Sequence, residues 1–253
     1  LGRVDKRDAF LDTHSLERER GITIFSKQAM LELGDTQITL IDTPGHIDFA
    51  GEVERALAAL DYAVVIVSAV EGVRAHTENI LKSLDDSKIP RLIFINKADR
   101  AGSDIKNVLN EIRSVIKNTD IVLSEISDEG SESCTVTLAD EESFCTVATE
   151  VLAEICDEAA EVFLEDKVLS REKADEIIKR EISDCRLTPI TYGSAKYSVG
   201  IKELADILVK YMPDSKKRST DALSGIIFKI EHDKTAGKIS HIRLFGYHCH
   251  IGS

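Results

Sequence analysis

The chain has 253 residues, of which 43% are hydrophobic, and it carries a formal net charge of −13. This length can bury a sizeable core and predicts one full domain with part of another. No apolar run approaches the roughly twenty residues that a membrane helix needs, so no membrane partner is expected. The five cysteines lack metal-ligand spacing, which indicates reduced thiols and a cytoplasmic location.

The first expected strand, at residues 37–41, leads into the run Asp42-Thr43-Pro44-Gly45-His46. Asp42 would stand at the carboxyl end of this strand, where open α/β sheets bind ligands, and its carboxylate can hold Mg²⁺ through a water. Pro44 fixes one backbone angle, and Gly45 lets the main chain approach closely enough to donate its N–H to a terminal phosphate. Taken alone, the run could also be a chance turn between a strand and a helix, although this is the less favoured interpretation.

Further along the chain, apolar strands alternate with amphipathic helices. This alternation predicts an α/β fold with a mostly parallel sheet and helices on both faces. The expected strands lie at about residues 63–69, 91–95 and 189–192, and the expected helices at about 48–60, 75–86, 104–117 and 201–211.

A second polar run, Asn96-Lys97-Ala98-Asp99, directly follows the strand at 91–95. Guanine presents two donors on one edge, and the Asp99 carboxylate can accept from both, whereas adenine would set an acceptor against it. Asn96 can tie loops together and bond the base, while the Lys97 stem can lie over the ring. This run therefore predicts a guanine-binding loop.

Two weaker runs complete the expected pocket. Thr23 supplies a hydroxyl that can ligate Mg²⁺ when a γ-phosphate is present, although alone it is more typical of an ordinary strand residue. After the strand at 189–192, backbone N–H groups can contact the guanine carbonyl from the run Gly193-Ser194-Ala195-Lys196.

The order of these motifs resembles that of translational GTPases of the elongation factor G class. The residues of the motifs most resemble those of the tetracycline-resistance ribosomal protection proteins. The resemblance covers nearly the whole chain and is weakest between about residues 119 and 184. Residues 225–231 and 239–244 resemble the start of the β-barrel second domain of that class. The other stretches that carry the likeness are residues 16–24, 42–49 and 192–196.

The resemblance implies a ribosome-dependent GTPase that uses GTP/GDP and Mg²⁺, with Thr23 and Asp42 as metal ligands. It gives His46 the role of placing the attacking water in line with the γ-phosphate. It implies a monomer whose partner is the ribosome, through ribosomal RNA and proteins, with no DNA partner. The alternatives are a translocating elongation factor G and, from another class, a non-hydrolysing guanine-nucleotide switch or interaction module; His46 could also be a solvent-facing residue at a helix start.

The loop Gly-x-x-x-x-Gly-Lys-[Ser/Thr], which cradles the β- and γ-phosphates in P-loop proteins, occurs nowhere in the chain. We therefore expect an N-terminally truncated P-loop-type GTPase domain at residues 1–212, inactive as a fragment. A linker at 213–224 and the start of a β-barrel domain at 225–253, opening with a hairpin around Gly237, would follow.

The segment at about residues 119–184 holds most of the acidity. Between Asp120 and Asp184 lie 20 acidic and 5 basic residues, so the rest of the chain is nearly neutral. Apolar spacing predicts one helix through residues 147–159 and a second at 174–182. The segment resembles the insert of elongation factor G-like GTPases, where it could face basic ribosomal proteins; a solvated surface of two amphipathic helices is an equal alternative.

Overall fold

The computed structural model describes residues 27–45, 50–212, 224–233, 235 and 237–245. The chain divides into two compact units, which are described one at a time. One unit comprises residues 61–214, and the other comprises residues 1–60 together with residues 215–253.

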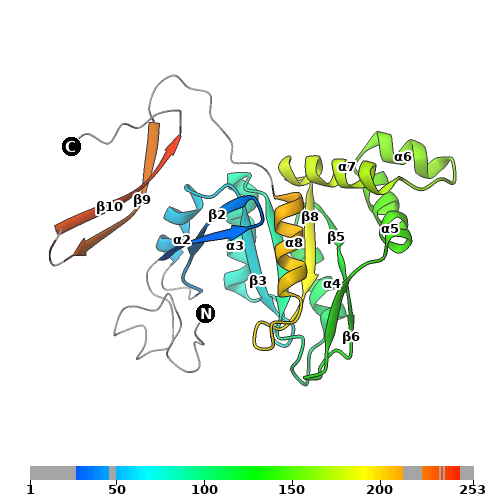
Figure 1. The fold of residues 1–253 in the computed structure, drawn as a ribbon, viewed down its shortest axis with the longest axis horizontal. Helices are drawn as coiled ribbons and strands as arrows, with labels where there is room; N and C mark the ends of the chain where they lie inside the picture. Colours follow the sequence, from blue (N-terminus) through cyan, green and yellow to red (C-terminus); the bar gives the residue numbers. More distant parts are fainter. Residues whose placement is uncertain (1–26, 46–49, 213–223, 234, 236, 246–253) are drawn as a thin grey trace. The chain divides into compact units, whose positions relative to one another are not determined.

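The unit at residues 61–214 is built on a four-stranded parallel sheet (Figure 1). Each strand pairs in parallel with its neighbours, as the alternation of strands and helices predicted. In spatial order, the strands are β3 (Ala63–Ser68), β4 (Arg91–Asn96), β8 (Leu187–Tyr192) and β5 (Thr119–Val122).

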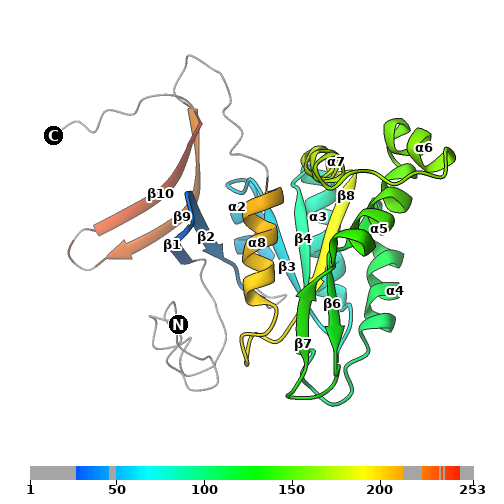
Figure 2. The ribbon, with the colours of Figure 1, turned by 45° about the vertical axis from the view of Figure 1, so that its right-hand side comes forward.

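Helices cover both faces of this sheet, which Figures 1 and 2 show with α8 opposite α3 and α4. Leu92 and Phe94 of β4 belong to a buried cluster that also contains residues of α8, whereas the intervening Ile93 is fully buried on the other face. The expected helices are confirmed within a few residues. They are α3 (Ala75–Ser87), α4 (Ile105–Val115) and α8 (Ile201–Tyr211).

The acidic segment folds differently from the two helices that its spacing predicted. A short antiparallel hairpin precedes three helices. There are three helices and not two because the helix expected at 147–159 is interrupted at Cys156, whose backbone is extended and whose N–H donates to the Leu152 carbonyl. Neither β5 nor this hairpin was expected. The elements are β6 (Ser124–Ser127), β7 (Thr135–Leu138), α5 (Glu141–Ala153), α6 (Asp157–Leu164) and α7 (Arg171–Ser183).

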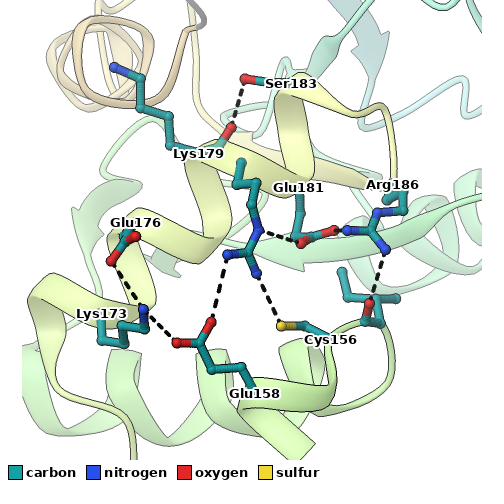
Figure 3. A network of polar contacts seen from close by, with 10 residues as sticks. Cys156, Glu158, Lys173, Glu176, Lys179, Glu181, Ser183 and Arg186 are labelled. Carbon is teal, nitrogen blue, oxygen red and sulfur yellow. Dashed lines mark hydrogen bonds and ion pairs between the residues drawn. The ribbon is translucent and has the colours of Figure 1, made fainter.

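A network of ion pairs joins the helices of the acidic segment to the start of β8 (Figure 3). At its centre, the fully buried Glu181 carboxylate contacts Arg180 Nε at 3.1 Å and Arg186 Nη2 at 2.6 Å. Arg180 also reaches Glu158 of α6 at 3.6 Å and donates to Cys156 Sγ at 3.2 Å. The network thus fixes α6, α7 and the approach to β8 against one another.

Among the described residues of the other unit, the chain forms two antiparallel hairpins and one helix. The strand expected at 37–41 is confirmed, but its described partner is an unpredicted strand joined to it by a tight turn, in which Gly34 has φ +58°. The C-terminal hairpin is confirmed, with Gly237 at φ +74° and a bulge between His241 and Ile242. The elements are β1 (Lys27–Leu33), β2 (Thr36–Asp42), α2 (Ala50–Leu57), β9 (Ser224–Asp233) and β10 (Gly237–Phe245).

Within the described ranges, no helix combines the length and the apolar character that crossing a membrane requires. The linker predicted at 213–224 falls almost entirely outside the described residues.

Candidate nucleotide-binding site

The loop that follows β4 carries Asn96, whose side chain links two separate segments. Asn96 Oδ1 accepts the N–H of Lys97 at 2.8 Å and the N–H of Ala195 at 2.9 Å. Ala195 lies 99 residues after Asn96 in the sequence. The Asn96 carboxamide therefore joins the loop after β4 to the loop after β8, which are far apart in the chain. The role expected for Asn96, tying loops together, matches this geometry.

Main-chain hydrogen bonds join the same two loops. Gly193 donates its N–H to the Ile95 carbonyl at 2.9 Å, and Ala98 donates to the Gly193 carbonyl at 3.1 Å. Since β4 and β8 are parallel neighbours, their carboxyl ends meet at one edge of the sheet, where the two loops begin. The structure therefore brings together all seven residues expected here: Asn96, Lys97, Asp99, Gly193, Ser194, Ala195 and Lys196.

Two glycines allow the loop after β8 to fold back on itself. A Cβ at Gly193 would lie 2.2 Å from the Val199 carbonyl oxygen and 2.9 Å from the Phe94 ring. Gly200 has φ +73°, and a Cβ there would lie 2.2 Å from the Tyr192 carbonyl oxygen. Only glycine fits either position, so the path of this loop is fixed by close backbone contacts.

Asp99 and Lys97 are held in different ways. Asp99 is 7% exposed, so leaving its carboxylate without a hydrogen-bond partner would cost free energy. Lys97 has φ +69°, and its Nζ contacts Glu71 Oε1 at 2.7 Å. This hydrogen bond, with the positive charge of Lys97, lowers the pKa of Glu71.

Sequence reasoning missed several residues that surround these loops. Glu71 follows β3 at the same edge of the sheet, and its position after a buried strand was the available signal. Glu129, Glu132 and Tyr197 also contact the loops, and nothing in their spacing indicated it.

The residues expected at the phosphate end lie in the other unit. Asp42 ends β2 in register with Lys27 and is half-buried, and Pro44 is buried. An added Cβ at Gly45 would meet no atom of the described residues within 4 Å, so packing against this part of the chain does not require glycine there. Thr43 is half-buried beside them. Thr23 and His46 lie outside the described residues.

The described residues fit a guanine base better than they define a metal site. A buried carboxylate that can accept hydrogen bonds, a carboxamide whose oxygen already accepts two N–H groups and a lysine stem together suit the polar edge and the face of guanine. Among the residues that the structure describes, no group of three or more histidines, cysteines, aspartates or glutamates is placed to hold a metal.

Over residues 2–214, the sequence matches the family described as the Elongation factor Tu GTP binding domain. The chain belongs to this family. The loops at the carboxyl ends of β4 and β8 thus lie in a GTP-binding domain, the fold and ligand class that the motifs predicted.

Two curated relatives extend the comparison. The tetracycline resistance protein TetP of Clostridium perfringens is 35% identical over 250 residues, covering 97% of this chain and 38% of the relative. The tetracycline resistance protein TetM of Ureaplasma urealyticum is 33% identical over 251 residues, covering 99% of this chain and 38% of the relative. The chain therefore spans about two-fifths of the length of these relatives.

A solved structure shares the fold. A crystal structure of a protein from Thermus thermophilus superimposes with a TM-score of 0.82 at 23% identity, covering 97% of this chain and 41% of that one.

Proposed function

We propose that the protein to which this chain belongs is a ribosome-dependent GTPase that confers tetracycline resistance by releasing the drug from the ribosome. The observation that carries the proposal is the Asn96 carboxamide, which holds the loops after β4 and β8 together beside the buried Asp99. The GTP-binding family and the names of the relatives support the assignment.

At the base, Asp99 accepts the two donors of the guanine edge. Asn96 and the backbone N–H groups of Gly193, Ser194 and Ala195 hold the loops through hydrogen bonds within the protein. The N–H of Lys196 contacts the guanine carbonyl, while the Lys97 stem covers the ring. Because Lys97 Nζ is anchored by Glu71, its stem has a restricted direction, which favours stacking over solvation.

At the phosphate end, Asp42 would hold Mg²⁺ through a water, and Thr23 would add a hydroxyl ligand in the triphosphate state. Mg²⁺ would supply charge neutralisation on the β- and γ-phosphates, and it commonly takes only one or two protein ligands. His46 orients the water, and the ribosome is the activator.

The domain boundaries predicted from the sequence form part of the same proposal. Residues 1–212 belong to the GTP-binding domain, and residues 225–253 begin a β-barrel domain. The phosphate loop, which the chain lacks, would be supplied by the full-length gene product, together with the domains that act on the drug. The protein works as a monomer on ribosomal RNA and proteins, without a DNA or membrane partner.

GTP turnover by the full-length gene product, with and without ribosomes, tests the function. We expect turnover to rise at least about a hundredfold with ribosomes, because the activator must align the water and His46. His46→Ala should lose most of that stimulation while guanine-nucleotide affinity stays within about twofold, since the role proposed for His46 is at the γ-phosphate and not at the base. Full stimulated turnover by this variant would refute the catalytic assignment.

The two ribosomal alternatives differ in phenotype. Expression of the intact gene in a susceptible host should raise the minimum inhibitory concentration of tetracycline if the protein protects ribosomes. An unchanged value, combined with support of translocation in a purified translation system, would instead identify an elongation factor G. Ribosome-independent nucleotide binding without turnover would identify a non-hydrolysing switch.

A further inference from the structure

The turn at residues 128–134, between β6 and β7, reaches from the acidic segment to both guanine-reading loops. Gly130 donates its N–H to the Ala98 carbonyl at 2.8 Å, and Ala98 in turn donates to the Gly193 carbonyl at 3.1 Å. A continuous line of main-chain hydrogen bonds therefore runs from the turn through the loop after β4 to the loop after β8.

Glu129 holds the far end of the loop after β4. Its Oε1 accepts the Ser103 hydroxyl at 2.7 Å and the N–H of Ile105, the first residue of α4, also at 2.7 Å. This carboxylate satisfies one of the N–H groups left open at the start of a helix. The segment that contains Asp99 is consequently fixed at Ala98 by Gly130 and at Ser103 by Glu129.

Glu132 holds the loop after β8. Its carboxylate accepts the Tyr197 hydroxyl and lies 3.6 Å from Lys196 Nζ. Lys196 Nζ also donates to the Tyr197 hydroxyl at 2.7 Å and lies 4.4 Å from the centre of that ring. Tyr197 and Glu132 raise the pKa of Lys196, so the cation that joins this contact stays charged.

Cys134 ends the turn, donates its N–H to the Ser131 carbonyl at 3.0 Å and lies within electrostatic range of Asp99. The thiol is 2% exposed, and its pKa is raised by burial and then by the nearby charges of Asp99 and Asp128. The same turn therefore forms part of the surroundings of the carboxylate that reads the guanine edge.

We propose that the turn between β6 and β7, through Glu129 and Glu132, positions the two guanine-reading loops and thereby sets the selectivity for guanine. The proposal rests on the guanine-binding role given above to Asp99. Glu129 and Glu132 are positioning residues, because they contact the loops and not the base. Only two residues separate β7 from α5, so the turn that contacts the loops is directly connected to the helices of the acidic segment.

Selectivity between GDP and inosine diphosphate provides the test, because hypoxanthine keeps the ring N1–H and lacks the exocyclic amino group. Affinities of both nucleotides would be measured by isothermal titration for the full-length gene product and for Glu129→Ala and Glu132→Ala. We expect each alanine variant to weaken GDP binding about tenfold and inosine diphosphate binding about threefold or less, since the misplaced Asp99 loses mainly the amino contact.

Matched variants separate positioning from folding. Glu129→Gln and Glu132→Gln keep an oxygen acceptor at the same place and should bind GDP within about twofold of the unaltered protein. Glu125→Ala removes the same charge from an exposed position on β6 and should leave both affinities unchanged. Melting temperatures of all variants would be recorded alongside.

Each outcome has one meaning. If the unaltered full-length protein does not bind GDP, the proposed function fails. If it binds GDP and the alanine variants keep the same ratio of GDP to inosine diphosphate affinity, the positioning role is overturned, whether or not their melting temperatures fall. A reduced ratio with glutamine rescue and a silent Glu125 control supports the role of the turn.

Discussion

Asp99 has two properties that suit recognition of guanine. It is almost fully buried, and it lies in the loop after β4, which the Asn96 carboxamide ties to the loop after β8. Burial makes a mismatched partner costly, because the carboxylate would face an acceptor without water to compensate. The identity of this single side chain should therefore decide which purine is bound.

Asp99→Asn should exchange the base preference of the full-length protein. The carboxamide offers a donor in place of one acceptor, which opposes the guanine amino group and matches the carbonyl that xanthine carries at that position. We expect GDP affinity to fall on the order of a hundredfold or more and xanthosine diphosphate affinity to rise. Competition binding with both nucleotides measures this, and an unchanged preference would remove Asp99 from the base site.

Ion pairs, as well as an apolar core, stabilise the packing of the helices in the acidic segment. Glu181 of α7 is fully buried, with Arg180 and Arg186 at its two oxygens (Figure 3). A buried carboxylate that loses one of two cations retains its desolvation cost, so the pairing matters more to stability than an exposed ion pair does.

Arg186→Ala should lower the free energy of unfolding by about 1–2 kcal/mol, because Glu181 is left with one cation while water reaches part of the vacated site. Urea unfolding followed by circular dichroism measures the change. Lys179→Ala, on the exposed face of the same helix, is the control and should stay within about 0.5 kcal/mol. Equal effects of the two substitutions would contradict the role of the network.

The contact between α6 and α7 should depend on pH. Glu158 contacts Lys173 Nζ at 2.5 Å, and this hydrogen bond, with the charges of Lys173 and Arg180, lowers the pKa of Glu158 below its ordinary value of 4.5. A carboxyl group with a lowered folded-state pKa contributes stability above about pH 4.5 and loses that contribution as the pH falls through the folded-state pKa.

Glu158→Gln should therefore lower the melting temperature at pH 7, and the difference from the unaltered protein should shrink steadily below about pH 4.5. Thermal unfolding at a series of pH values measures it. A difference that is as large at pH 3 as at pH 7 would show that the lost contact is not ionic.

For the whole molecule, the division into two units has a direct consequence. Residues 61–214 contain their own parallel sheet and a core that joins β4, β5 and β8 to α5, α7 and α8. Expressed alone, this unit should unfold cooperatively in urea, with a slope of about 1–3 kcal/mol/M. Circular dichroism is the suitable probe because the chain has no tryptophan; a gradual transition would contradict an independent core.

The isolated unit should tend to self-associate. β3 is the first strand of the described sheet, and its Ile66 is 55% exposed, so the excised unit presents an open, apolar strand edge. We expect Ile66→Lys to reduce its self-association in analytical ultracentrifugation without loss of the cooperative transition.

From the amino-acid sequence, we could predict the family, the alternation of strands and helices in the parallel sheet, and the residues that meet at its edge. This was possible because a strand places its last residues at a known edge, and because Asn96 and Asp99 are local signals with distinct chemistry. Glycines 193 and 200 belong to the same local pattern, although the reason for them lies in contacts with Val199 and Tyr192.

The fold of the acidic segment and its contacts could be seen only in the folded chain. Four-residue strands such as β6 and β7 carry too little periodicity to be recognised, and the break at Cys156 arises from backbone geometry that apolar spacing does not report. The contacts of Glu129 and Glu132 with the loops join residues that are 24 and 65 positions apart. Such pairings depend on chain folding in space, and no local pattern of residue types encodes them.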